Sequence, residues 1–296
     1  MSSGGLDTVD AAYLGASPAS IRHHYDVGDD FFGLWLDATR TYSCALWQEG
    51  EDTLEAAQLR KLDCLAEAVL PVRSRRVLDI GCGWGGLLRR LTEAHGVERA
   101  IGLTLSASQE RFVVAQSNPR CEVRLENWIE HLPSEPYDAI ISVGAFEHFA
   151  DFGMTRPMRV AAYRAFFERC HDWLPPGGRL ALQTNVKGNN TAMDRATVRE
   201  LLFIVDRIFP QSELPWTSEL LEASERRLDV VWARNDPDHY ARTCREWLIR
   251  LTGRRGQAEE MVGAELVSDY ERYLRAAAQA FERRHLGLLR IVFERP

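Results

Sequence analysis

A glycine-rich turn is the stretch of this sequence whose residue types and spacing most clearly suit ligand binding. Residues 77–80 are apolar except for Asp79, and Gly81, Gly83 and Gly85 follow, before leucines at helical spacing. Glycines let backbone N–H groups approach a ligand where a Cβ atom would clash, and a helix N-terminus attracts polar and anionic groups. The stretch therefore predicts a strand, a glycine loop and a helix that bind a nucleotide or an adenosyl group.

The surroundings of this turn separate two classes of ligand. A dinucleotide site has a GxGxxG turn and, about 20 residues further on, an acid at the end of the second strand. This chain has GxGxGG, and its second predicted strand, residues 100–106, ends in Leu-Thr-Leu-Ser. The missing acid favours S-adenosylmethionine over NAD, with Gln109 as a candidate ligand of the ribose. An NAD-dependent enzyme is the weaker alternative.

Further apolar runs have the spacing of alternating strands and helices. Strands are predicted at residues 121–125, 137–143, 179–186, 228–234 and 288–294, and helices at 53–69, from Ser106, at 159–173 and over 238–285. This alternation predicts an α/β fold with a doubly wound, mostly parallel sheet of seven strands. The ligands of such a sheet bind outside the carboxyl ends of its strands.

The same pattern divides the chain into four parts. Residues 1–70 are predicted to form a flexible arm (1–18) and an aromatic-rich helical cap, and residues 71–186 the S-adenosylmethionine-binding core. Residues 187–227, where Gly, Asn and Pro interrupt the alternation, are predicted to be an insertion that covers the substrate. Residues 228–296 supply the closing strands and C-terminal helices of the same domain.

The composition of the chain limits the classes of binding partner and the cellular location that we expect. The chain has 296 residues, 45% of them hydrophobic, which is enough for a full core. A net charge of −7 disfavours nucleic acid as a partner, and six cysteines without a CxxC pair disfavour a zinc site or disulfide framework. Neither a signal peptide nor a run of about 18 apolar residues is present. We therefore expect a cytoplasmic protein without stable membrane insertion; the sequence leaves a homo-oligomer open.

Four motifs together resemble one known family. They are HHYDVGDDFFGLWLDATRTYSCALW (23–47), VLDIGCGWGG (77–86), GLTLSASQ (102–109) and SVGAFEHF (142–149). In this order they resemble the cyclopropane-fatty-acid synthases, including the mycolic-acid cyclopropane synthases, and the similarity continues more weakly over nearly the whole chain. The resemblance implies a Rossmann-like class I methyltransferase fold and delivery of the S-adenosylmethionine methyl group to a carbon–carbon double bond.

The resemblance also implies which residues hold the cofactor. Tyr42 and Ser43 match residues at its carboxylate end, and Asp79 matches the acid that orders the loop and the amino-acid end. Gly81, Gly83 and Gly85 belong to the turn that admits the cofactor. Thr104, Leu105 and Gln109 match the ribose and adenine side, and Trp128 matches a side chain that stacks near the adenine.

The implied chemistry needs a shielded cation and a proton acceptor. An alkene is a weak nucleophile, so its methylation produces a carbocation that must be kept from water, and aromatic faces suit this task. Tyr25, Phe31 and Phe149 are candidates for contact with the acceptor. Glu147 is the candidate proton acceptor, directly or through a bound anion.

In the family that anion is bicarbonate, and one of its contacts differs here. The other contacts match Cys44, the Val143 backbone, Glu147 and Tyr240, whereas a family histidine is replaced by Gln183. Glutamine carries no positive charge, so weaker anion binding is expected. The sequence therefore predicts a methylated alkene as product, with a cyclopropane as the alternative.

The sequence leaves the acceptor open. An unsaturated acyl chain, on phospholipid or carrier protein, is the family's usual substrate class. An isoprenyl diphosphate such as isopentenyl diphosphate is the competing class, because three cations could neutralise its charge: Lys187, Arg195 and Arg199. A non-catalytic S-adenosylmethionine-binding protein is disfavoured, since Cys44, Glu147 and Tyr240 are all present.

Overall fold

The structure is a computed structural model that describes residues 27–50, 52–71 and 73–296. Tyr25 and the predicted arm, residues 1–18, lie outside the described residues. Within these ranges, no helix is both long enough and apolar enough to cross a membrane.

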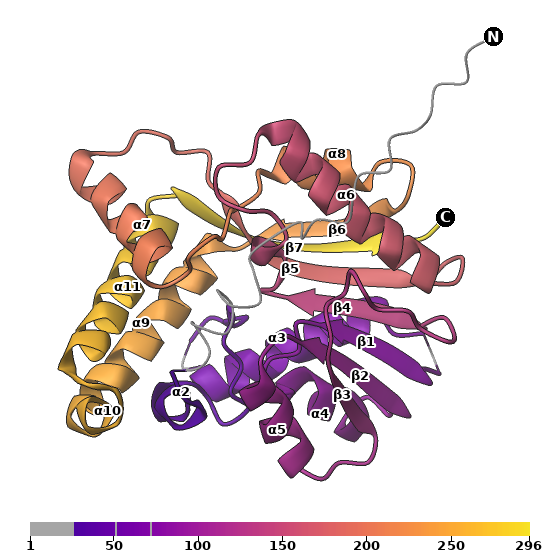
Figure 1. The fold of residues 1–296 in the computed structure, drawn as a ribbon, viewed down its shortest axis with the longest axis horizontal. Helices are drawn as coiled ribbons and strands as arrows, with labels where there is room; N and C mark the ends of the chain where they lie inside the picture. Colours follow the sequence, from indigo (N-terminus) through magenta and orange to yellow (C-terminus); the bar gives the residue numbers. More distant parts are fainter. Residues whose placement is uncertain (1–26, 51, 72) are drawn as a thin grey trace.

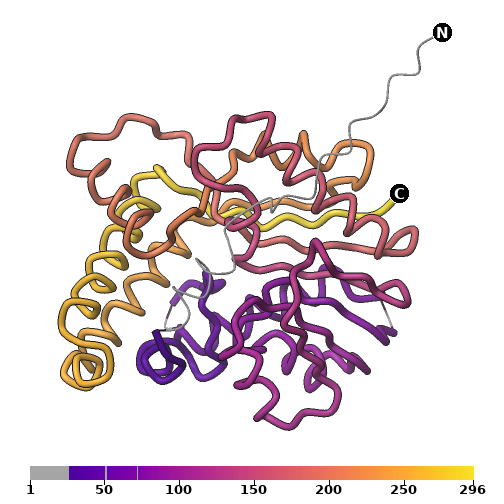
Figure 2. Tube along the Cα trace, viewed as in Figure 1, coloured from indigo at the N-terminus to yellow at the C-terminus, as the bar shows by residue number. Residues whose placement is uncertain are grey.

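A seven-stranded sheet forms the centre of the molecule (Figure 1). Its strands lie in the order β3-β2-β1-β4-β5-β7-β6, with the bounds β1 Arg76–Ile80, β2 Arg99–Thr104, β3 Cys121–Leu125, β4 Ala139–Val143, β5 Arg179–Lys187, β6 Asp229–Asn235 and β7 Leu286–Glu294. The first five strands run parallel, and β7 runs antiparallel between β5 and β6 (Figure 2). The predicted doubly wound, mostly parallel sheet is confirmed.

Helices cover both faces of the sheet, as crossover connections between parallel strands require. One face carries α3 (Leu54–Val69), α4 (Gly86–Glu93) and α5 (Ala107–Ala115). The other carries α6 (Arg156–Trp173) and α8 (Thr217–Ser224). The hydroxyls of Thr53 and Ser106 cap α3 and α5, accepting backbone N–H bonds at 3.2 and 3.4 Å.

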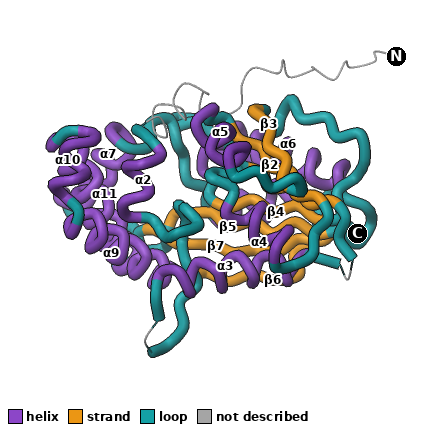
Figure 3. The backbone as a smooth tube through the Cα atoms, turned by 90° about the horizontal axis from the view of Figure 1, so that it is seen from below, coloured by secondary structure: helices purple, strands orange, loops and turns teal. Residues whose placement is uncertain are grey.

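A group of helices lies beyond the carboxyl ends of the parallel strands (Figures 1 and 3). It contains α2 (Asp29–Trp35), α7 (Arg195–Arg207), α9 (Pro237–Gly253), α10 (Arg255–Val262) and α11 (Ala264–Glu282). The single helical stretch predicted over 238–285 is thus three helices. One break falls at Arg254 and the other at Gly263, whose φ of +86° is the left-handed conformation that glycine tolerates.

Candidate active site

Two cavities meet at the carboxyl ends of the strands. The donor cavity, about 150 Å³, lies over β1, β2 and β4 and is bounded by the glycine turn. The acceptor cavity, about 400 Å³, lies between the sheet and the helical group. Tyr42, Gly144 and His148 line both cavities. A ligand in one cavity can therefore approach a ligand in the other.

Most of the predicted cofactor residues lie around the donor cavity. Its lining includes Tyr42, Ser43, Asp79, Gly81, Gly83, Thr104, Leu105, Gln109 and Trp128. Gly85 does not contribute to the lining. It precedes α4 with a φ of +72°, and a Cβ there would lie 2.8 Å from Val113 Cγ2, so this glycine serves close packing of the turn against α5.

The glycine turn has both a tight side and an open side. A Cβ at Gly81 would lie 2.4 Å from the Ala145 Cβ, and the N–H of Gly81 donates to the Leu103 carbonyl at 3.0 Å. A Cβ at Gly83 would meet no atom within 4 Å, although Gly83 lines the cavity. Gly81 therefore closes the turn against the loop after β4, while Gly83 leaves room for a ligand.

The acceptor cavity has an apolar body. Its lining includes Leu201, Ile204 and Val205 of α7, together with Phe209, Leu214, Tyr273, Ala277, Phe281 and Leu286. No residue of α7 is fully buried, although the helix has a distinct apolar face. This face covers a cavity instead of a close-packed core, and residues from the predicted insertion thus line the space.

Glu147 is one of the polar residues that line the acceptor cavity. Gly144, with φ +69°, turns the chain after β4 into the short 3₁₀ helix Phe146–His148. The Glu147 side chain is buried, and its Oε1 accepts the Asn185 backbone N–H at 2.7 Å. Its Oε2 has no hydrogen-bond partner in the part of the chain that the structure describes. Burial raises the pKa of Glu147 to about 7, against the opposing effect of the Asn185 N–H. This carboxylate can therefore accept a proton near neutral pH.

His148 lies where the two cavities join. Its Nδ1 is 2.9 Å from Ser212 Oγ, in the segment between α7 and α8. Burial lowers the pKa of His148 to about 4, so the imidazole is neutral at pH 7. In the sequence, His148 is part of the motif SVGAFEHF (142–149), but no role was predicted for it. Its position directly after Glu147 could have indicated that it lies in the site.

The five residues matched to the family's bicarbonate site do not share one cavity. Glu147 and Tyr240 line the acceptor cavity and Val143 lines the donor cavity. Cys44 and Gln183 are buried but line neither.

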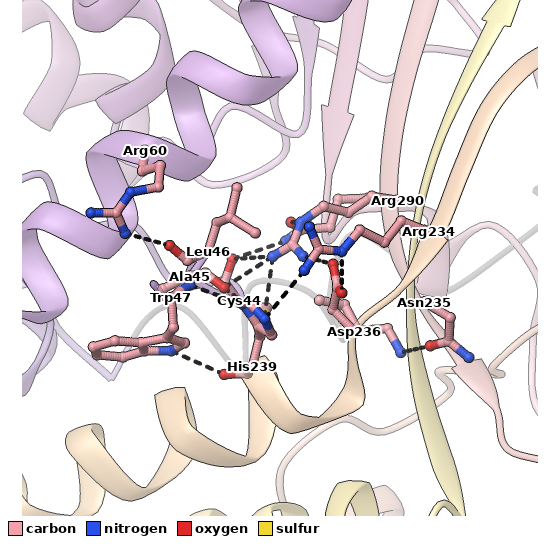
Figure 4. A network of polar contacts seen from close by, with 12 residues as sticks. Cys44, Ala45, Leu46, Trp47, Arg60, Arg234, Asn235, Asp236, His239 and Arg290 are labelled. Atoms are coloured by element: carbon pink, nitrogen blue, oxygen red, sulfur yellow. Dashed lines mark hydrogen bonds and ion pairs between the residues drawn. The ribbon is translucent and has the colours of Figure 1, made fainter. Parts of the chain in front are cut away.

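A buried arginine, Arg290, lies beside Gln183. Figure 4 shows this arginine between Asp236 and the Cys44–Ala45 backbone. Arg290 Nε donates to Gln183 Oε1 at 2.8 Å, and Gln183 Nε2 donates to the Cys44 carbonyl at 3.4 Å. Arg290 also forms an ion pair with Asp236. Gln183 itself is uncharged, as its sequence position indicates, but Arg290 of β7 brings a guanidinium next to it. The expectation of weaker anion binding stays a prediction. The Gln183 amide is held in this network, outside both cavities.

The described residues that were predicted to contact the acceptor do not lie in one place. Phe31 lines neither of these cavities; its ring packs against Tyr270 with centroids 5.0 Å apart. Phe149 lines the donor cavity beside Trp128, with ring centroids 5.0 Å apart. Phe31 is therefore part of the core of the helical group, and Phe149 lies on the donor side.

The three cations proposed for a diphosphate do not converge. Lys187 lines the acceptor cavity but is paired with Glu213. Arg195 and Arg199 are exposed on α7 and do not line the cavity. This arrangement leaves the diphosphate alternative without a structural basis.

Comparison with known proteins decides the family. The family model for mycolic acid cyclopropane synthetase matches residues 16–291. The chain belongs to this family. Hydroxymycolate synthase MmaA4 of Mycobacterium tuberculosis is 35% identical over 289 residues, covering 93% of this chain and 92% of that protein. Cyclopropane mycolic acid synthase 1 of the same organism is 36% identical, covering 89% and 92%.

Solved structures of family members have the same architecture. The cyclopropane synthase MmaA2 from Mycobacterium tuberculosis has a TM-score of 0.87 and 31% identity, covering 95% of this chain and 99% of that one. The mycolic acid cyclopropane synthase CmaA1, complexed with SAH and CTAB, has a TM-score of 0.86, 32% identity and the same coverage. Coclaurine N-methyltransferase shares the fold at a TM-score of 0.79 and 20% identity. The chain is thus an S-adenosylmethionine-dependent methyltransferase with the class I fold.

The donor cavity fits this cofactor on its own evidence. Asp79 is buried near the end of β1, and within residues 27–50, 52–71 and 73–296 its Oδ1 has no hydrogen-bond partner. A buried carboxylate oxygen without a partner is costly, and an ammonium group would compensate it. The open side at Gly83 and the indole of Trp128 line the same space. These groups suit an amino acid at one end and an adenosyl group at the other.

Proposed function

We propose that this enzyme transfers a methyl group to a carbon–carbon double bond of an apolar lipid acceptor, with Glu147 as the proton acceptor. The observation that carries the proposal is the buried Glu147 carboxylate, which lines a mainly apolar cavity and has one oxygen without a hydrogen-bond partner among the described residues. That cavity meets the donor cavity at Tyr42, Gly144 and His148. The alkene and the methyl donor therefore meet beside a base.

Bound S-adenosylmethionine supplies an electrophilic methyl group. The π electrons of the double bond form the new carbon–carbon bond as the methyl–sulfur bond breaks, leaving a cation on the other alkene carbon. The apolar lining excludes water, which would otherwise capture that cation. Glu147 accepts the proton whose loss neutralises it.

The neighbouring histidine is suited to this cation because it is uncharged. Burial holds the pKa of His148 at about 4, and Ser212 fixes its Nδ1. A protonated imidazole at the cavity junction would repel the carbocation. The neutral ring can line the reaction site without repelling the carbocation.

The position of Glu147 favours a methylated alkene over a cyclopropane. Ring closure needs a base beside the incoming methyl group, whereas Glu147 lines the acceptor cavity and not the donor cavity. We therefore propose that its carboxylate takes a proton from a carbon of the acceptor. Gln183, which matches one of the family's bicarbonate contacts, is instead hydrogen-bonded to Arg290. We therefore propose that Glu147 acts without bicarbonate.

The acceptor is an unsaturated acyl chain. The apolar lining of the acceptor cavity suits a hydrocarbon chain, and its one lysine is already paired. Two relatives are named as a hydroxymycolate synthase and a cyclopropane mycolic acid synthase, so their names refer to mycolic acids. We propose that the chain is presented on phospholipid or a carrier protein.

Product analysis tests this function. The enzyme is incubated with S-adenosylmethionine and unsaturated acyl chains on phospholipid or acyl carrier protein, and the products are examined by mass spectrometry and NMR. We expect a gain of one CH₂ with the new carbon bonded to a former alkene carbon. Methylation on oxygen or nitrogen, or no transfer to either presentation of the acyl chain, would overturn the proposal.

A further inference from the structure

We propose that Lys61 is the charged anchor for the carboxylate of the cofactor's amino-acid end, and that Asp79 is its counterpart for the ammonium group. The two side chains line the same cavity and carry opposite charges. The inference rests on cofactor binding in the proposed function but is independent of the acceptor.

Lys61 occupies a position where a helix normally places an apolar residue. It lies on the buried side of α3 between Ala57 and Leu65, and its side chain is fully buried. Lysine is rarely buried unless it is paired. A buried lysine on the wall of the donor cavity therefore needs an explanation beyond packing.

The ammonium of Lys61 is incompletely satisfied. Its Nζ donates to Ser43 Oγ at 2.8 Å, and within the described ranges it forms no ion pair. An ammonium group has three N–H donors, so capacity remains for an anion. A carboxylate that reaches Lys61 would also reach Ser43, which lines the same cavity.

Asp79, which lines the same cavity, supplies the complementary group. It is the next-to-last residue of β1, just before the glycine turn, and is 2% exposed. Its Oδ1 has no hydrogen-bond partner among the described residues. Asp79 and Lys61 do not form an ion pair with each other among the described residues. Two opposite charges that line one cavity without neutralising each other suit a zwitterion.

Electrostatics support this assignment. Burial and the nearby Arg290 lower the pKa of Lys61 to about 7, against the opposing charges of Asp37, Cys44 and Asp79. Burial raises the pKa of Asp79 to about 7. Each group thus lacks a sufficient countercharge. A bound zwitterion would supply both, because its carboxylate favours the charged lysine and its ammonium favours the charged aspartate.

Two related ligands distinguish binding of the cofactor's carboxylate by Lys61 from a purely structural role of this lysine. S-adenosylhomocysteine and 5′-methylthioadenosine share the adenosine and thioether groups, but only the former has the carboxylate and ammonium. Isothermal titration measures both ligands on the wild type and on Lys61→Met, which keeps the length of the side chain without its charge. The matched control is Lys187→Met, in the acceptor cavity.

We expect Lys61→Met to bind S-adenosylhomocysteine about 10- to 100-fold more weakly, the loss associated with a charged hydrogen bond, and to bind methylthioadenosine within about twofold of the wild type. Lys187→Met should leave both affinities unchanged. An equal loss for both ligands, or no loss for either, would overturn the anchor role. Failure of the wild type to bind S-adenosylhomocysteine would instead refute the cofactor assignment itself.

A second measurement uses only the wild-type protein. Decarboxylated S-adenosylmethionine keeps the ammonium and the sulfonium but lacks the carboxylate. We expect it to bind at least about tenfold more weakly than S-adenosylmethionine. Equal affinity would show that no cationic side chain holds the carboxylate, whatever the stability of Lys61→Met.

Discussion

Arg290 Nε donates a 2.8 Å hydrogen bond to Gln183 Oε1, which joins β7 to β5 through two fully buried polar side chains. The Gln183 amide in turn donates to the Cys44 carbonyl at 3.4 Å. The position that differs from the family pattern is therefore tied to the protein interior. We therefore expect this contact to contribute to the stability of the fold and to keep Gln183 out of the two cavities.

Turnover should not depend on bicarbonate, because Gln183 and Cys44 lie outside both cavities. The rate is measured in carbonate-free buffer under nitrogen and again after bicarbonate is restored. We expect the two rates to agree within about twofold. Restoration of activity by bicarbonate would show that an anion, and not the Glu147 carboxylate alone, accepts the proton.

Removing Arg290 should destabilise the fold strongly. Arg290→Met removes the buried guanidinium that pairs with Asp236 and leaves this carboxylate only the partly exposed Arg234 as an ion-pair partner among the described residues. Breaking a buried pair costs about 3–5 kcal/mol, and we expect about 3 kcal/mol here because Arg234 remains. Urea unfolding measures the change in the free energy of unfolding. The matched control is Arg284→Met, which breaks an exposed pair with Asp238 and should cost less than about 1 kcal/mol. Equal effects would contradict the interior role of Arg290.

Replacing Glu147 should separate chemistry from cofactor binding. Glu147→Gln keeps the shape of the side chain but removes the base, so turnover should fall by at least about 100-fold. Because Glu147 does not line the donor cavity, the affinity for S-adenosylhomocysteine should stay within about twofold. A variant with wild-type turnover would remove Glu147 from the mechanism.

The pH dependence of turnover follows from the same carboxylate. Burial raises the pKa of Glu147 to about 7, and only the ionised form accepts a proton. The rate should therefore rise as pH increases from 6 to 8 and level off above the pKa. The residual rate of Glu147→Gln should lack this rise. A rate that falls over this range would contradict a basic role for Glu147.

Burial of Glu147 also has a consequence for stability. Its folded-state pKa lies above that of an exposed glutamate, so ionisation disfavours the folded state as pH rises through this interval. Glu147→Gln should therefore gain stability relative to the wild type at pH 8 and gain less at pH 5. Unfolding curves at the two pH values measure the difference. An advantage for the wild type that grows with pH would contradict this reasoning.

The fold was predictable because local patterns and tertiary structure agree. Near-continuous apolar runs such as residues 139–143 are what a parallel strand buried on both faces requires, and Ser106 marked the start of α5. The glycine turn was predicted for the same reason, since it follows directly after such a strand. Glu147 was singled out by the resemblance of its motif, residues 142–149, to the family. The helical stretch over 238–285 was less well predicted, because helical periodicity continues across the breaks at Arg254 and Gly263.

The parts of the site that were missed depend on long-range contacts. Arg290 lies within an apolar strand, and its partners Gln183 and Asp236 come from other elements. The sequence pattern already places Lys61 on the apolar face of α3. That its side chain lines the donor cavity depends on how α3 packs against the sheet, which the sequence pattern does not show. Conversely, Arg195 was assigned to the substrate from charge alone, and the structure exposes it on α7.

The central claim is that Glu147 removes a proton from the acceptor after methyl transfer. It is tested most directly with S-adenosylmethionine that carries a trideuterated methyl group, followed by mass spectrometry and NMR of the isolated lipid. If Glu147 takes the proton from an acceptor carbon, the product is a methylated alkene that retains all three deuterium atoms. A cyclopropane that retains only two would show that the proton is lost from the transferred methyl group, and would contradict the account.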